Sequence, residues 1–222
     1  KMQENSVIGI IMATHLEGDP FVDELSLDRW EDDPFPVYRN EKAVLLISGI
    51  GKANAAMGCT YLGMKFHPSR IYNLGAAGAA DISFPLGSIY HVRKVIEPDR
   101  PDLETGLPHE HTPDTIPGYP TVTLATQDRP IKDPSERRMI FPQAEIMDME
   151  GAAVVQACRL LQIRCLLFKF VSDNPQNHDI KNNIVRYRDS FRDFFCNKVL
   201  PHNCINHMAP NRSFPLNCNS ER

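Results

Sequence analysis

Short apolar runs recur along the chain and predict buried β-strands. Residues 7–12 (VIGIIM) and 43–47 (AVLLI) are aliphatic throughout, without the polar alternation of a strand that faces water on one side. Such runs are typical of strands covered on both faces. The same reasoning predicts four more strands, at residues 71–74, 88–96, 121–126 and 165–171.

Apolar residues at helical spacing alternate with these strands and predict helices at residues 52–66, 150–161 and 184–200. Strands alternating with helices are typical of βαβ units built around a parallel sheet. We therefore predict a single α/β domain over residues 7–200, with a central mixed, mostly parallel sheet flanked by helices. Residues 201–222 show no pattern and are predicted to form an irregular tail.

Residues 97–120 are rich in Pro, Asp, Glu and His and show no periodicity, which predicts a long loop. The His109-Glu110-His111 triplet lies within it without helical spacing, so we interpret it as surface rather than as a metal site. No GxGxxG or GxxxxGK[ST] motif is present, which disfavours a dinucleotide-binding or P-loop enzyme. We expect neither a metal nor a cofactor.

Charge and composition narrow the functional classes further. The 222 residues carry a formal net charge of −4, with 24 basic and 28 acidic residues spread along the chain. Without a basic run, nothing predicts nucleic-acid binding. The apolar stretches are too short to span a bilayer, and the first residues lack the apolar segment of a secretory signal. Lys1 before Met2 is interpreted as a tag remnant, and a cytoplasmic location is expected.

The six cysteines divide into two groups of three. Cys59, Cys158 and Cys165 lie in apolar segments and are predicted to be reduced core residues. The other three, Cys196, Cys204 and Cys218, lie near the C-terminal end. A disulfide among them and a tag-derived tail are both compatible with this pattern. No pair has CxxC spacing, so a zinc site is not expected.

Polar or glycine-rich residues follow several predicted strands, where ligands bind in open α/β sheets. Asp173 ends a buried run, although an aspartate before Asn174-Pro175 is also typical of a turn. Glu150 opens a helix, where a carboxylate is also favoured by the helix dipole. Glu17 follows the first strand and, taken alone, is more typical of a solvated loop acid.

Taken together, five segments resemble the methylthioadenosine/S-adenosylhomocysteine nucleosidases of the nucleoside phosphorylase family, and more loosely the futalosine hydrolases. They are IGIIMATHLE (8–17), SGIGKANAA (48–56), NLGAAG (73–78), DMEGAA (148–153) and VSD (171–173). The resemblance covers about residues 7 to 200. It implies hydrolysis of the N-glycosidic bond of a 5′-substituted adenosine-type nucleoside, and a homodimer.

The resemblance also implies roles for individual residues. Asp173 is expected to act as the general acid at purine N7, oriented by Ser172, and Glu17 to activate water. Glu150 would bind the ribose hydroxyls, with Met149 packed on the sugar. The remaining expected lining residues are Ile50, for the 5′ substituent, and Ala76, Ala77 and Gly78, for the sugar and base.

The chain departs from the family pattern in residues 126–131 (TQDRPI). Pro130 stands where relatives place an aromatic that stacks on the purine, so base contacts are expected from Asp128 or Ile131. A helix that relatives place before residue 121 is also expected to be absent, which leaves the identity of the nucleoside open.

Two other functions fit this pattern less well. One is a phosphorolytic enzyme of the same fold, which Gly18-Asp19-Pro20 faintly suggests. No arginine follows that segment, and Glu17 would repel a phosphate dianion. The other is a catalytically silent nucleoside-binding protein, against which the three carboxylates Glu17, Glu150 and Asp173 argue.

Overall fold

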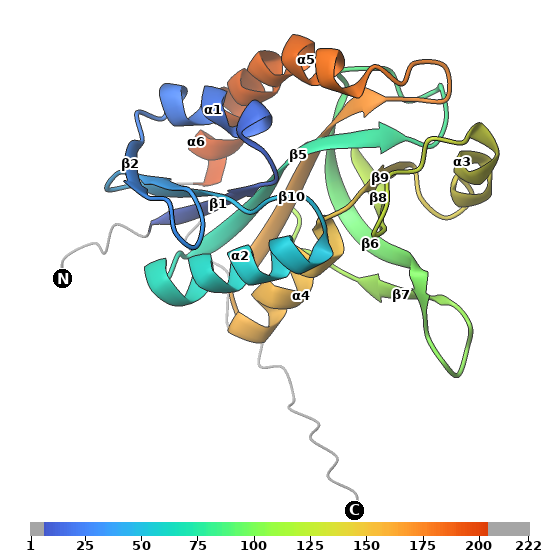
Figure 1. The fold of residues 1–222 in the computed structure, drawn as a ribbon, viewed down its shortest axis with the longest axis horizontal. Helices are drawn as coiled ribbons and strands as arrows, with labels where there is room; N and C mark the ends of the chain where they lie inside the picture. Colours follow the sequence, from blue (N-terminus) through green and yellow to red (C-terminus); the bar gives the residue numbers. More distant parts are fainter. Residues whose placement is uncertain (1–6, 204–222) are drawn as a thin grey trace, which may run out of the picture.

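The computed structural model describes residues 7–203, which form one ten-stranded sheet with helices on both faces. The strands run in the order β10-β6-β8-β9-β5-β1-β4-β3-β2, with β7 paired to β6 (Figure 1). Their bounds are β1 Ile8–Met12, β2 Asp28–Glu31, β3 Val37–Arg39, β4 Ala43–Ile47, β5 Arg70–Ala79, β6 Ile89–Pro101, β7 Pro108–His111, β8 Thr121–Thr126, β9 Ile146–Asp148 and β10 Arg164–Asp173.

The sheet is less parallel than the sequence predicts, because part of it closes on itself. Strand β5 pairs with both β9 and β10, so β5, β10, β6, β8 and β9 form a barrel-like ring. Pairs β1–β4, β1–β5, β5–β10, β6–β8 and β8–β9 are parallel. The β6–β10, β5–β9, β6–β7, β2–β3 and β3–β4 pairs are antiparallel. Strands of ten residues (β5 and β10) and thirteen (β6) accumulate enough twist to curl the sheet.

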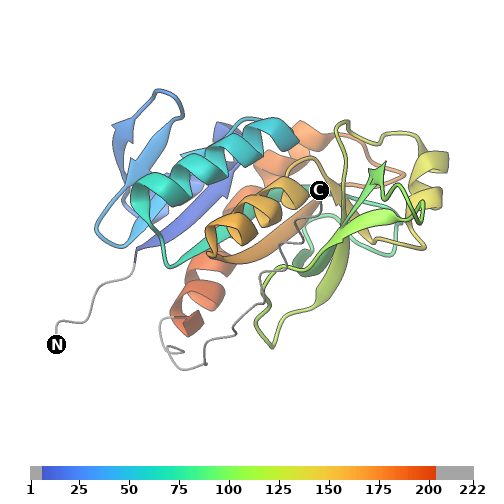
Figure 2. The ribbon, with the colours of Figure 1, turned by 90° about the horizontal axis from the view of Figure 1, so that it is seen from below.

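Helices cover the two faces as separate layers. Helices α2 (Lys52–Phe66) and α4 (Gly151–Leu161) lie side by side on one face (Figure 2). Helices α1 (His15–Glu24) and α5 (Ile180–Phe194) pack together on the other. A short helix α3 (Pro134–Ile140) precedes β9, and α5 continues as a π-helical turn, Phe195–Val199, into α6 (Leu200–Asn203). Each layer encloses its own apolar core.

Most predicted elements are present, with different limits. The predictions at 43–47, 52–66 and 121–126 match β4, α2 and β8. The predicted strand 71–74 is too short, because β5 continues through Gly75 and Gly78 instead of turning there. The last helix begins at Ile180 rather than at residue 184. The loop predicted at 97–120 is partly wrong, since the end of β6 and the whole of β7 lie within it.

The three cysteines predicted as core residues, Cys59, Cys158 and Cys165, are buried with free thiols. Cys196 is a half-buried free thiol, whereas Cys204 and Cys218 lie outside the described residues. Most of the predicted tail also lies outside them. Among the helices of residues 7–203, none has the length and apolar character needed to cross a membrane.

Candidate active site

A cavity opens where β1, β5 and β10 end, and most of the predicted site residues line it. Ten of the predicted residues are brought together there: Glu17, Ile50, Ala76, Ala77, Gly78, Ile131, Met149, Glu150, Ser172 and Asp173. Asp128 is not among the lining residues. Its side chain is 74% exposed and lies 3.9 Å from Lys52, and its backbone N–H donates to Asp99 at 2.8 Å. A contact between Asp128 and the base therefore stays a prediction.

Glu17 is a buried cavity residue, so its interpretation as a solvated loop acid is wrong. It lies in the first turn of α1 with 6% of its surface exposed. Its Oε1 accepts the backbone N–H of Ala76 at 2.8 Å, and its Oε2 accepts the Thr14 hydroxyl at 2.6 Å. A Cβ on Gly75 would lie 2.9 Å from Oε1, so glycine is required for this approach. Two donors from different elements thus fix the Glu17 carboxylate.

Glu150 precedes the first residue of α4 and is bound by the loop before α2. The Gly51 N–H donates to its Oε1 at 2.8 Å and the Met149 N–H to its Oε2 at 3.3 Å. Burial, together with the negative charge of Asp148, raises the pKa of Glu150 to about 7. Glu150 therefore exchanges between its neutral and ionised forms near neutral pH.

Lys169 is a fully buried cation that contacts the cavity residue Asp148, and the sequence analysis missed it. Its Nζ lies 2.9 Å from Asp148 Oδ2, and Asp148 also accepts the Thr126 hydroxyl at 2.7 Å. Burial lowers the pKa of Lys169, but the charges of Asp148 and Glu150 outweigh burial and raise its pKa overall. The positive charge of Lys169 thus partly balances the acidic side of the site. A lone lysine inside the run LLFKFV was the signal that could have identified it.

Asp173 enters the cavity through an irregularity in β10. The β5–β10 register shifts between Val171 and Asp173, and Asp173 then pairs with Gly78. Such irregularities re-aim side chains and are frequent beside active sites. The expected orienting contact is present, since the Ser172 hydroxyl donates to Asp173 Oδ1 at 2.8 Å. A Cβ on Gly78 would lie 2.9 Å from Asp173 Oδ2, so the carboxylate rests directly against the bare glycine.

Arg137 on α3 is a second cation that the sequence analysis missed. It is 1% exposed, lines the cavity and forms an ion pair with Asp173. An ion pair requires an ionised carboxylate, whereas general acid catalysis requires a protonated one. The role of Asp173 as the acid therefore stays a prediction. In the charged segment PSERRM, nothing distinguishes Arg137 from a solvated surface arginine.

Among the residues that line the cavity, the loop before α3 contributes no aromatic ring. Pro130 lines it in the position where relatives are expected to carry an aromatic, beside the buried Ile131. Within the described part of the chain, no Phe, Tyr, Trp or His is among the lining residues. Arg129 also lines the cavity, and two of its nitrogens are each 2.9 Å from the Glu136 carboxylate.

His111 and Lys52 form a network with acidic residues beside the site. His111 is buried, and its Nε2 donates to Glu97 at 2.7 Å, so its interpretation as a surface residue is wrong. The Lys52 Nζ lies 2.7 Å from Asp99 and 3.2 Å from Glu97. These contacts attach the beginning of α2 to β6, since Glu97 and Asp99 both belong to that strand.

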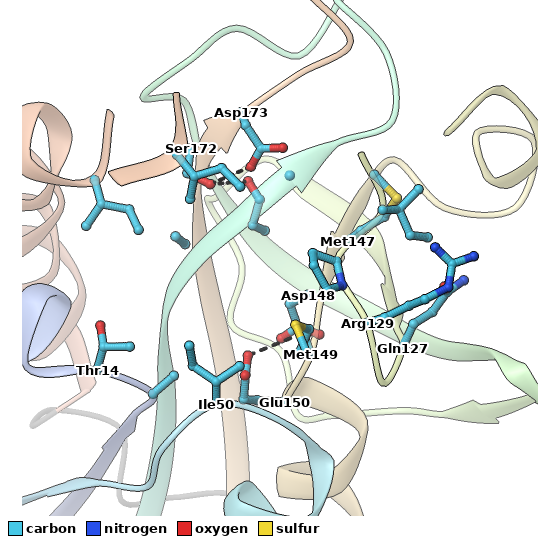
Figure 3. Close-up of a pocket in the computed structure, with 18 of the residues that line it drawn as sticks. Thr14, Ile50, Gln127, Arg129, Met147, Asp148, Met149, Glu150, Ser172 and Asp173 are labelled. Carbon is cyan, nitrogen blue, oxygen red and sulfur yellow. Dashed lines mark hydrogen bonds between the residues drawn. The ribbon is translucent and has the colours of Figure 1, made fainter. Parts of the chain in front are cut away.

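The functional groups separate into two ends of the cavity. Figure 3 shows Ser172 and Asp173 at one end, and Thr14, Ile50 and Glu150 at the other. A bound molecule can thus meet a guanidinium–carboxylate pair at one end and two carboxylates at the other. Carboxylates near a developing cation, with a polar group at the leaving group, are the components that glycoside hydrolysis requires.

Sequence comparison finds a matching family model and similar proteins of known description. The family model described as the phosphorylase superfamily matches residues 8–198. The 5′-methylthioadenosine/S-adenosylhomocysteine nucleosidase of Staphylococcus carnosus is 30% identical over 158 residues, covering 60% of this chain and 69% of that protein. The enzyme of the same description from Baumannia cicadellinicola is 26% identical over 212 residues, covering 81% of this chain and 92% of that protein.

Solved structures share the fold at lower identity. The 5′-methylthioadenosine/S-adenosylhomocysteine nucleosidase of Helicobacter pylori superposes with a TM-score of 0.79 at 15% identity, covering 90% of this chain and all (100%) of that one. Futalosine hydrolase of the same organism has a TM-score of 0.76 at 17% identity, covering 88% and 98%. Since the family model matches nearly the whole described fold, the chain belongs to the phosphorylase superfamily.

Proposed function

We propose that the protein hydrolyses the N-glycosidic bond of a 5′-substituted adenosine-type nucleoside, releasing the base and a ribose derivative. The observation that carries the proposal is the convergence of three buried carboxylates, Glu17, Glu150 and Asp173, in one cavity. The relatives from Staphylococcus carnosus and Baumannia cicadellinicola, both described as nucleosidases, support the same reaction.

Glu17 is the group proposed to activate water. Its carboxylate is fixed by the Ala76 N–H and the Thr14 hydroxyl, so little reorganisation is needed when it accepts a proton. A positioned carboxylate can act as a general base and can also stabilise the oxocarbenium-like ribosyl group.

The remaining groups are proposed to hold the substrate. Glu150 accepts hydrogen bonds from the ribose hydroxyls, Met149 packs on the sugar, and Ile50 contacts the 5′ substituent. Ser172 and Asp173 lie at the end of the cavity away from Glu150 (Figure 3), and we propose that this end holds the base. The backbone of residues 76–78 lies between the two ends, beside both Glu17 and Asp173.

Release of the base should not require phosphate. We expect the purified protein to release free base from 5′-methylthioadenosine at the same rate with and without phosphate, and to yield a reducing sugar. The acidic residues Glu17 and Glu150 would repel a phosphate dianion, which favours water as the nucleophile. Phosphate-dependent activity with ribose 1-phosphate as product would show a phosphorylase instead. No base release from any purine nucleoside would indicate a silent binding protein.

Substrate affinity should increase as the pH rises through neutrality. Ionised Glu150 can accept hydrogen bonds on both oxygens, whereas its neutral form loses part of this capacity. Because the pKa of Glu150 is raised to about 7, the ionised form is gained as the pH rises past that value. We expect KM to fall roughly three- to tenfold between about pH 6 and about pH 8, the scale of one net hydrogen bond of about 0.5–1.5 kcal/mol.

The matched control for this pH dependence is Glu150→Gln, which cannot ionise and should give a KM that is higher and independent of pH. The KM of both proteins would be measured from initial rates over the same pH series. A pH dependence retained in the Gln variant would assign the titration to another group.

A homodimer and a cytoplasmic location are also proposed, on the resemblance and on the sequence respectively. The exposed apolar side chains of Met57 and Met64 on α2 would suit contact with a second copy.

A further inference from the structure

We propose that Asp99 and Lys52 are positioning residues that hold two segments of the cavity wall together. Neither residue is among those that line the cavity in the described part of the chain. Through the two segments they keep the Gly51 N–H on the Glu150 carboxylate, the group proposed to bind the ribose. Their effect on substrate binding rests on the proposed function.

The first support is that one carboxylate joins both segments. Asp99 lies near the end of β6, where its Oδ1 accepts a hydrogen bond from the Lys52 Nζ at 2.7 Å. Its Oδ2 accepts the backbone N–H of Asp128 at 2.8 Å. Lys52 is the first residue of α2 and directly follows residues 48–51, whereas Asp128 belongs to residues 127–131. Residues of both segments line the cavity, so Asp99 connects two parts of its wall.

The second support is the charge network that holds the Lys52 ammonium. The side chain of Lys52 is only 15% exposed, and its Nζ also lies 3.2 Å from Glu97, which is 1% exposed. Glu97 is bound from its other side by His111 and Arg100. Burial lowers the pKa of Lys52, but the hydrogen bonds to Asp99 and Glu97 outweigh burial and raise it overall. Lys52 is therefore a fixed cation, and its contacts are less screened by salt than those of a surface pair.

The third support is the short path from Lys52 to the site. The preceding residue, Gly51, donates its N–H to Glu150 Oε1 at 2.8 Å. Such a bond favours the ionised form of a carboxyl group. Burial and the charge of Asp148 raise the pKa of Glu150, whereas the bond from Gly51 lowers it. A contact that fixes Gly51 therefore influences the pH at which Glu150 ionises.

The sign of the change distinguishes positioning from simple electrostatics. Removing the negative charge of Asp99 would, by electrostatics alone, lower the pKa of Glu150. Loosening Gly51 would raise that pKa, because the ionised carboxylate loses a donor. Asp99→Ala thus raises the pKa of Glu150 only if Asp99 acts through Gly51. The other charged groups that face Glu150 stay in place in this variant, and they are Asp148, Lys169 and Glu17.

The test is the titration of Glu150, followed by NMR of labelled glutamate carboxyl carbons and assigned by the signal missing in Glu150→Gln. In Asp99→Ala we expect the midpoint to lie about 0.5–1 pH unit above that of the wild type, the scale of one hydrogen bond. The KM for 5′-methylthioadenosine at about pH 7 should rise roughly two- to fivefold, and kcat at about pH 9 should change less than about twofold.

Three lysine variants complete the comparison. Lys52→Met removes the same contact and should raise the midpoint, whereas Lys52→Arg keeps a cation between the same carboxylates and should keep the wild-type midpoint. Lys65→Met is the matched control, since Lys65 pairs with Glu31 near the other end of α2 and should not affect Glu150. If Asp99→Ala does not fold, Asp99→Asn keeps one acceptor oxygen and should show a smaller rise.

The outcomes separate this role from the proposed function, because the titration needs no substrate. If the wild type releases no base but Asp99→Ala raises the Glu150 midpoint, the proposed function is wrong and the positioning role stands. An unchanged or lowered midpoint in Asp99→Ala, even with a lower melting temperature, would show a purely structural residue and overturn the positioning role. An equal rise in Lys65→Met would trace the effect to α2 as a whole and overturn it too.

Discussion

Replacing Glu17 with glutamine should lower the turnover number about 10²–10⁴-fold, the contribution of a positioned general base. The amide cannot take a proton from the attacking water, and it removes a negative charge from the site of the oxocarbenium-like sugar. The fold should tolerate the change. Gln can still accept the Ala76 N–H through its oxygen, and the Thr14 hydroxyl can rotate to accept from the new amide group.

Single-turnover rates and substrate affinity, measured on the same preparation, would test the Glu17→Gln prediction. Affinity should change much less than the chemical step, because Glu17 is proposed to act mainly on the water. The matched control is Asp23→Asn, an exposed carboxylate on the same helix, which should keep full activity. A Glu17→Gln variant that hydrolyses substrate at the normal rate would remove Glu17 from the mechanism.

The site residues that the sequence predicts are those whose positions follow from short patterns along the chain. Glu17 and Asp173 follow buried runs, and the carboxyl ends of neighbouring parallel strands meet at one edge of a sheet. The strands β1, β5 and β10 are parallel neighbours, so residues at their ends converge as predicted. Most of the core can also be predicted from the sequence, because uninterrupted apolar runs predict strands buried on both faces.

The parts that were missed depend on contacts between distant segments. The ring closes because β5 pairs with both β9 and β10, and no local pattern encodes this pairing. The exposed β2 and the seven-residue α3 bury too few side chains to leave a clear periodicity. Arg137 reaches the cavity only because α3 lies against Asp173, a residue 36 positions further along the chain. Lys169, in contrast, could have been identified from the sequence. A charged residue inside an apolar run is visible there, and a buried charge requires a partner of opposite charge.

Asp173→Asn should cause the second large loss, lowering turnover at least about 10²-fold, the cost of displacing one preorganised electrostatic group. Asn can accept a hydrogen bond from Arg137, but it supplies no negative charge to hold the guanidinium. Removing one partner of a buried ion pair typically destabilises a protein by about 3–5 kcal/mol. We therefore expect a lower melting temperature together with the loss of turnover. Ser172→Ala should be milder, since it removes only the bond to Asp173 Oδ1.

Melting temperature and single-turnover rates of the same Asp173→Asn preparation separate the contribution of Asp173 to stability from its contribution to catalysis. The double variant with Arg137→Met should be more stable than Asp173→Asn alone, because it leaves no unpaired buried charge. Its turnover of purine nucleosides should nevertheless stay low, since the Asp173 carboxylate is still missing. If the double variant regains stability but not activity, the ion pair contributes to catalysis as well as to the stability of the fold. A stable and fully active Asp173→Asn variant would end the assignment of Asp173 to the leaving base.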